Sequence, residues 1–158
     1  MGNSYSLHYT SFEFYSAVDI IINTLPEDDQ ACLIAKTTPA ADETARIEAL
    51  IAEREYNKKI VVYGYNCADT KPEKKARQLA GLGFSNVQVY RGGLFEWLLL
   101  QDIYGSSNFP TTSYERDIMR FSSCGAEKDE PRRKSFAAAA AAARNSPGTT
   151  PKKSTVCF

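Results

Sequence analysis

One cysteine of this sequence lies where a fold could make it reactive. In the stretch IVVYGYNCADTKPEKKAR, residues 60–77, Cys67 stands in a polar loop between an apolar run and a helical pattern. Backbone N–H groups of such a loop, with the N-terminus of the next helix, can hold an anion or stabilise a thiolate. The candidate site comprises Gly64, Tyr65, Asn66, Cys67, Ala68, Asp69 and Thr70. The alternative is an inert residue that fills space, as most intracellular cysteines are, and the sequence leaves both interpretations open.

The elements that must position this loop follow from hydrophobic patterns. Continuous apolar runs over Val18–Leu25 and Lys59–Tyr65 are typical of strands that are buried on both faces of a parallel sheet. Shorter runs over Ala31–Ala35 and Asn86–Tyr90 predict two more strands. Helical spacing predicts helices over Asp42–Tyr56, between Thr70 and Gly83, and over Gly92–Gly105. Alternating strands and helices indicate a three-layer α/β domain with a mostly parallel sheet, whose ligands bind at the carboxyl ends of strands.

The start of the helix behind the loop carries the strongest local signal. Thr70 is the predicted N-cap, Pro72 lies in the first turn and Glu73 is the third helical residue, which together predict a capping box. Gly83 is predicted to end this helix. Asp42 is the predicted cap of the preceding helix.

The motif that follows identifies a family. The stretch GFSNVQVYRGGLFEW, residues 83–97, resembles the second half of a rhodanese-like domain, with a strand, a double-glycine turn at Gly92 and Gly93, and a helix that bears Trp97. The resemblance extends over Tyr15–Thr112. It implies a central five-stranded, mostly parallel sheet covered by helices on both sides. In active members of the family, it also implies a cysteine that carries a persulfide from a sulfur donor to an acceptor.

The sequence departs from this family pattern at the site itself. The nucleophilic cysteine of active members normally stands where this chain has Gly64, and Cys67 comes three residues later. Asn23 and Leu25 replace an Asp and an Arg that sulfurtransferases of the family usually have. Two hypotheses follow: a binding or regulatory module without conventional sulfurtransferase activity, or an atypical sulfurtransferase that carries a persulfide on Cys67 from a thiosulfate or mercaptopyruvate type of donor.

A phosphatase is disfavoured by the same loop. Phosphatases of this fold need an arginine six positions after the cysteine, because a guanidinium holds the phosphate through two hydrogen bonds. Counting from Cys67 reaches Glu73, a carboxylate that would repel phosphate.

Composition limits the domain organisation and the partners. With 158 residues, 43% of them hydrophobic, the chain can bury one core. We expect an N-terminal segment over 1–14, the rhodanese-like domain over 15–121 and a disordered, low-complexity tail over 122–158. Lys and Arg together number 19, as do Asp and Glu, so no net field favours nucleic acid. The expected partner is a small sulfur donor or a protein.

Cysteine and histidine usage bears on compartment and cofactors. The four cysteines show no paired spacing and no secretory signal precedes them, so reduced thiols in the cytoplasm are expected. His8 is the sole histidine, so no zinc ligand set is expected. No cofactor is predicted.

The first residues, MGNSYS, match the N-myristoylation pattern, with Gly2 as the acceptor and Ser6 at the required place. Membrane contact is expected only if Gly2 is acylated. One acyl chain binds membranes reversibly and needs a second signal, which the basic clusters of the tail could supply unless they merely keep it solvated.

The segment FEWLLLQDIYGSSNFPTT, residues 95–112, is rich in large apolar side chains. We interpret it as a helix buried against the sheet, with Tyr104, Phe109 and Pro110 over its end. The alternative is a surface patch that binds a partner.

Overall fold

The computed structural model describes residues 5–123. The expected lipidation site at Gly2 and residues 124–158 of the expected tail lie outside the described residues.

The described residues build one parallel sheet from four short strands. These are β1 (His8–Thr10), β2 (Ile20–Asn23), β3 (Ile60–Tyr63) and β4 (Val87–Tyr90), in the spatial order β1-β4-β3-β2. Between the edge strand β2 and its neighbour β3, Ile20 lies opposite Ile60 and Asn23 opposite Tyr63, so these two strands end together at the carboxyl edge. Three α-helices, α1 (Ala40–Ala52), α2 (Lys71–Gly81) and α3 (Gly93–Tyr104), connect or follow the strands, and the 3-10 helices are η1 (Phe12–Ser16), η2 (Glu27–Asp29) and η3 (Ile118–Phe121).

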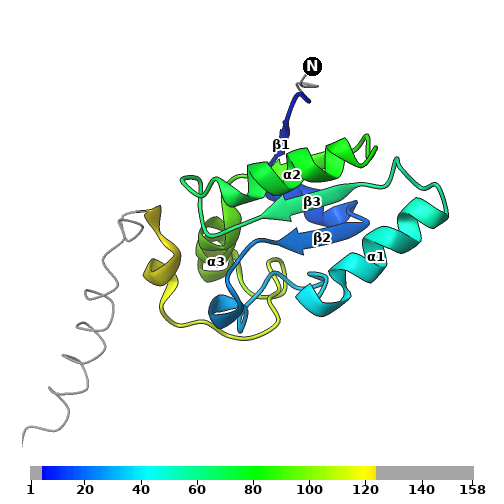
Figure 1. Ribbon diagram of the computed structural model, residues 1–158. Coiled ribbons are helices and arrows are strands. Elements are labelled where there is room, and N and C mark those ends of the chain that lie inside the picture. The colour runs from blue at the N-terminus through cyan, green and yellow to red at the C-terminus, as the bar shows by residue number, and fades with distance from the viewer. Residues whose placement is uncertain (1–4, 124–158) are drawn as a thin grey trace, which may run out of the picture. The chain divides into compact units, whose positions relative to one another are not determined.

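Side chains alternate between two cores because successive residues of a strand point to opposite faces. Ile20, Ile22, Ile60 and Val62 pack with residues of α1 and α2 on one face. Ile21, Val61 and Tyr63 pack on the other face with residues of α3, η1 and η3. The result is the predicted three-layer α/β arrangement, with the sheet between helices (Figure 1).

The sheet differs from the expectation at two segments. The described residues form four strands instead of five, because Ala31–Ala35 makes only an isolated antiparallel bridge between Ile34 and Thr111. The Ile34 N–H instead donates to the Tyr63 hydroxyl at 3.2 Å. In contrast, β1 was not predicted, and it pairs with β4 ahead of the expected domain boundary at residue 15.

Two predicted caps are also corrected. Helix α1 begins at Ala40 after Pro39, and the Asp42 N–H already donates to the Pro39 carbonyl within the first turn. Thr70 precedes α2, but its side chain makes no capping hydrogen bond. An N-cap residue usually has an extended backbone, whereas Thr70 has helical angles (φ −92°, ψ −8°). Gly83, which was predicted to end this helix, follows the end of α2 by two residues and has φ 108°.

Candidate functional site

The predicted loop begins directly after β3, at the carboxyl edge of the sheet, where the fold predicts a ligand site. Gly64 and Asn66 are buried, whereas Cys67, Ala68 and Thr70 are exposed. Cys67 is a free thiol. The loop therefore turns the cysteine outward, toward solvent.

A carboxylate of the loop occupies the space beside Gly64, where a nucleophile of the family would have its side chain. A methyl group added at Gly64 would lie 2.3 Å from Asp69 Oδ2 and 2.8 Å from the Pro72 ring. The same Oδ2 accepts the Tyr65 N–H at 3.2 Å, and Asp69 Oδ1 accepts the Lys71 N–H at 3.0 Å. Asp69 thus takes both the volume and two of the amide donors that an external anion would need.

Asn66 fixes the middle of the loop from inside. Its side chain is 6% exposed, and its Oδ1 accepts the Ala68 N–H at 2.9 Å. Its Nδ2 donates to the Phe121 carbonyl at 2.8 Å. The Asp69 N–H donates to the Asn66 carbonyl at 3.2 Å. The amides of Ala68 and Asp69 are therefore satisfied within the loop, as are those of Tyr65 and Lys71.

The turn between β4 and α3 lies against the same loop. The N–H groups of Leu94 and Phe95 donate to the carbonyls of Gly64 and Tyr65, each at 2.9 Å. A methyl group added at Gly93 would lie 2.6 Å from the Gly64 carbonyl oxygen, and the residue has φ 65°. Only glycine suits both the close approach and this backbone angle.

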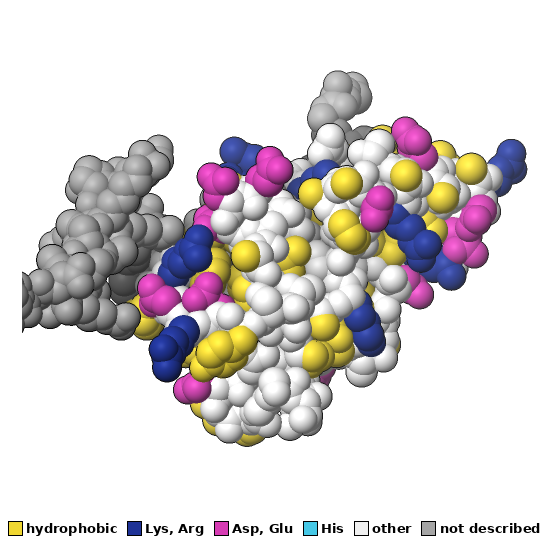
Figure 2. All heavy atoms as spheres, turned by 90° about the horizontal axis from the view of Figure 1, so that it is seen from below, with side chains coloured by type: hydrophobic (Ala, Val, Ile, Leu, Met, Phe, Trp, Pro, Cys, Tyr) yellow, Lys and Arg dark blue, Asp and Glu magenta, His cyan; other side chains and the backbone are white. Residues whose placement is uncertain are grey.

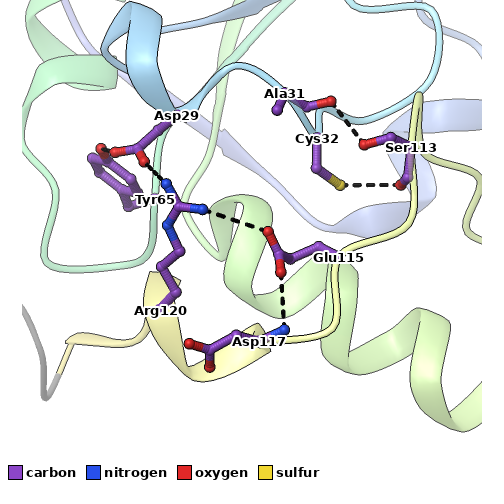
Figure 3. Close-up of polar contacts among 8 residues, drawn as sticks. All are labelled: Asp29, Ala31, Cys32, Tyr65, Ser113, Glu115, Asp117 and Arg120. Atoms are coloured by element: carbon purple, nitrogen blue, oxygen red, sulfur yellow. Dashed lines mark hydrogen bonds and ion pairs between the residues drawn. The ribbon is translucent and has the colours of Figure 1, made fainter. Parts of the chain in front are cut away.

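An ionic network covers the start of the loop. The Tyr65 hydroxyl and the Arg120 guanidinium both donate to the carboxylate of Asp29, and Arg120 Nη1 lies 3.6 Å from Glu115 Oε2 (Figure 3). The Tyr65 ring stacks on that of Phe121 with centroids 6.0 Å apart. These contacts join η2, the loop and η3, which are distant in sequence.

The two strand-end positions that lack the charged pair of the family have structural roles. Asn23 Oδ1 accepts the Leu25 N–H at 3.2 Å, which closes a local turn. Leu25 is 4% exposed and belongs to the core beside α3. Neither position therefore adds a charge to the site.

A second cysteine, which sequence reasoning did not single out, is buried near the other end of the network. Cys32 Sγ donates to the Ser113 carbonyl at 3.2 Å, and the Ser113 hydroxyl donates to the Ala31 carbonyl at 2.7 Å (Figure 3). Burial raises the pKa of the Cys32 thiol. Cys32 is therefore a packing residue that joins the segment after η2 to the segment after α3.

Part of the apolar segment 95–112 is buried against the sheet, as expected for a core helix, and part of it is exposed. Trp97, Leu98 and Phe109 are buried, and Trp97 Nε1 donates to the Pro110 carbonyl at 3.1 Å. Ile103 and Tyr104 are 70% and 61% exposed. On the face seen in Figure 2, exposed hydrophobic side chains form separate patches among charged ones.

Neither a metal cluster nor a membrane span is found in residues 5–123. In that part of the chain, no group of three or more His, Cys, Asp or Glu side chains could hold a metal ion. None of its helices is both long and apolar enough to cross a membrane.

In the arrangement as a whole, the Asp69 carboxylate accepts the Tyr65 and Lys71 amides at the edge of the sheet where the fold predicts a ligand site. Asp69 was included among the candidate loop residues, but its role was missed. The signal was present, because an aspartate just before a helix that starts with an early proline is a frequent cap.

A family model and several solved structures are similar to this chain. The Rhodanese-like domain model matches residues 17–100. The Rhodanese_3 like domain of an Anabaena sp. protein is 20% identical, with 61% of this chain and 94% of that domain covered and a TM-score of 0.43. A full-length protein from Lactobacillus plantarum is 19% identical, with 67% and 88% covered and a TM-score of 0.44. No curated protein matches the chain. Because the family model matches more than half of its residues, this chain belongs to the rhodanese-like domain family.

Proposed function

We propose that this rhodanese-like domain acts as a binding or regulatory module and does not perform conventional sulfurtransfer. The observation that carries the proposal is the position of Asp69 Oδ2, 2.3 Å from where a side chain at Gly64 would begin. A persulfide is an anion that needs donors free to receive it. In this loop, the Tyr65 and Lys71 amides already donate to Asp69.

Charge supports the same proposal. A carboxylate next to the site repels thiosulfate, which is an anion, and Asn23 and Leu25 offer no compensating cation. The nearest guanidinium described in the network, Arg120, is held by Asp29 and Glu115. Arg120 is therefore engaged elsewhere, and the basic side chains of α2 that lie at this edge, Lys71, Lys74 and Lys75, line a hollow beside Asn23 and Thr24.

The second candidate function is sulfurtransfer through Cys67, and the exposure of this thiol favours it, because a donor can reach the sulfur. In that reaction the Cys67 thiolate attacks the outer sulfur of thiosulfate. A Cys67 persulfide forms and sulfite leaves with the electron pair of the broken S–S bond. Cyanide then removes the outer sulfur as thiocyanate and restores the thiolate. Phosphatase activity is disfavoured, because the residue six positions after Cys67 is Glu73, which accepts a hydrogen bond from Tyr9.

Intact-mass spectrometry of the full chain separates these two functions. The reduced protein is incubated with thiosulfate or 3-mercaptopyruvate, beside the Cys67→Ala variant and a known sulfurtransferase. We expect no added sulfur on this chain under conditions that load the known enzyme. A gain of one sulfur that cyanide reverses, and that Cys67→Ala abolishes, would contradict the proposal and establish the second function.

A further inference from the structure

A hollow lies where the first turns of α2 pass the carboxyl end of β2. Its volume is about 450 Å³, and it is lined by Asn23, Thr24, Lys71, Lys74, Lys75 and Gln78. The four residues from α2 recur at spacings of three and four, which places them on one flank of the helix. Figure 1 shows α2 beginning at the edge of the sheet where β2 ends. Ligands of open parallel sheets bind outside this edge.

The hollow carries more positive charge than neighbouring carboxylates balance. Lys75 forms an ion pair with Glu43 of α1. Lys71 and Lys74 are exposed, and no acidic side chain of residues 5–123 forms an ion pair with either of them. Glu73 does not line the hollow, and a hydroxyl of β1 donates to its carboxylate. Two of the three ammonium groups therefore lack a carboxylate partner in this part of the chain.

The position of these two lysines on the helix is unfavourable for stability. Lys71 and Lys74 belong to the first turn of α2, where the N–H groups of the backbone already give a helix a partial positive charge. Acidic side chains stabilise the first turn of a helix, and basic ones stabilise the last. Proteins break such local preferences mainly where function requires it. The two lysines therefore favour an anionic ligand in the hollow.

Neutral donors lie beside the lysines. Gln78 is exposed, and the described residues supply no acceptor for its side-chain amide. Asn23 is 7% exposed, and its Oδ1 accepts the Leu25 N–H, whereas residues 5–123 supply no acceptor for its Nδ2. The Thr24 hydroxyl donates to the Tyr63 carbonyl at 3.3 Å and is already engaged. The two amide side chains thus add hydrogen-bond donors to the charge of the lysines.

We propose that the hollow formed by Asn23, Lys71, Lys74, Lys75 and Gln78 binds a phosphate monoester. Such a group carries roughly 1.5 to 2 negative charges at neutral pH, which matches the ammonium groups of the two lysines without a carboxylate partner. Its three terminal oxygens accept charge-assisted hydrogen bonds. Lysines bind phosphate as point charges and do not need the fork geometry of arginine. The inference goes beyond the proposed function, because it would stand even if Cys67 carried sulfur.

An NMR titration of the full chain tests the proposal with two probes that share this group. The first probe is glycerol 3-phosphate, with glycerol as its control. The second is an alanine pentapeptide with a central phosphoserine, with the unphosphorylated peptide as its control. We expect at least one phosphorylated probe to shift the amide signals of residues 71–78 to saturation, and neither control to do so. The probe that binds more tightly identifies the source of the phosphate.

Charge variants decide whether the hollow is the site. K71Q/K74Q should weaken binding of the tighter probe by at least about tenfold, because charge-assisted hydrogen bonds are lost. R77Q/R116Q is the matched control, because it removes the same number of positive charges from exposed residues that do not line the hollow. We expect this control to change binding by less than about twofold, since salt screens distant charges.

The ion pair of the hollow supplies a test in the opposite direction. Glu43→Gln removes a carboxylate and frees Lys75, so it should strengthen binding roughly threefold. The NMR spectrum of each variant shows directly whether it is folded. The proposal is overturned if neither phosphorylated probe shifts residues 71–78, if K71Q/K74Q binds as the unmodified protein does, or if R77Q/R116Q weakens binding as much. Weaker binding by Glu43→Gln would also contradict it.

Discussion

Two neighbouring turns at the carboxyl edge of the sheet differ in how much of the family's sequence pattern they keep. The turn after β4 keeps the family motif, with Gly92 and Gly93 leading into α3 and Trp97 at 0% exposure in the core. The loop after β3 has Gly64 at the nucleophile position, a carboxylate beside it and an outward-facing Cys67. The residues that support the loop by packing and backbone hydrogen bonds are present, whereas Gly64, at the position that the family resemblance assigns to the nucleophile, has no side chain. A fold can keep the contacts that support a site while the residues of the site change.

The two regions remain physically joined. Gly93 lets the turn after β4 come close enough to donate two backbone hydrogen bonds to the carbonyls of Gly64 and Tyr65. Substitutions in the turn after β4 and in α3 should therefore lower the free energy of unfolding the most. Substitutions in the loop after β3 should lower it less.

The largest effect is expected at Trp97, which contacts the rings of Phe14, Tyr90 and Phe109. Trp97→Ala should lower the free energy of unfolding by about 3–5 kcal/mol, because it leaves a cavity and removes one of the two donors to the Pro110 carbonyl, the other being the Ala35 N–H. Urea denaturation measures this change. Tyr104→Ala, at a 61% exposed position of the same helix, is the control and should cost less than about 1 kcal/mol. If both variants lost the same free energy of unfolding, burial of Trp97 would not be what makes this side of α3 important for stability.

Gly93→Ala should be next, with a loss of about 3 kcal/mol, because the new methyl group would meet the Gly64 carbonyl and the residue has φ 65°. Gly81→Ala is the matched control. Gly81 lies in α2 with open space around it, so alanine there should stabilise the protein by up to about 1 kcal/mol. Thermal denaturation of both variants makes the comparison, and a tolerated Gly93→Ala would argue against the tight contact between the two regions.

A double-mutant cycle tests whether Asp69 fills the space at Gly64. Gly64→Ala should cost about 2 kcal/mol, since its methyl group would overlap Asp69 Oδ2, and Asp69→Ala about 1 kcal/mol through its two lost hydrogen bonds. We expect the double variant to be more stable than the sum of the two losses implies. Strict additivity in urea denaturation would mean that the two side chains do not compete for one volume.

The smallest effect is expected at Thr70. Thr70→Ala should change the free energy of unfolding by less than about 0.5 kcal/mol, because the threonine side chain caps nothing and the residue is exposed. A true N-cap would lose about 1 kcal/mol on the same substitution. Circular dichroism during denaturation detects the difference, and a loss of that size would restore the capping box that the sequence predicts.

Sequence patterns predicted the fold where one physical signal dominates. The runs of Ile and Val in β2 and β3 are buried on both faces of the parallel sheet, although β2 is its edge strand, and both strands were predicted. Strand β1, with the sequence HYT, has neither a continuous apolar run nor a clear alternation, so its pairing with β4 could not be foreseen. Ala31–Ala35 has the composition of a strand, yet Ile34 donates to Tyr63 and bridges Thr111, contacts that are remote in sequence.

The loop between β3 and α2 was predicted from the sequence, but its internal hydrogen bonds were not. The family pattern located the loop at 64–70 and the substitution at Gly64. The choice between Asp69 and Thr70 as the capping side chain depends on the backbone angles of Thr70, which residue types alone do not fix. The network of Tyr65, Asp29 and Arg120 joins residues up to 91 positions apart, which a single sequence does not reveal.

The central claim, that Asp69 accepts the loop amides that an external anion would need, is tested most directly by amide hydrogen exchange measured by NMR in the unmodified protein and in Asp69→Ala. The account predicts that the Tyr65 and Lys71 amides, which donate to Asp69, exchange on the order of tenfold faster in the variant. The Leu94 and Phe95 amides, which donate to the loop carbonyls, should change much less. Equal changes at all four amides, or none at Tyr65 and Lys71, would contradict the claim.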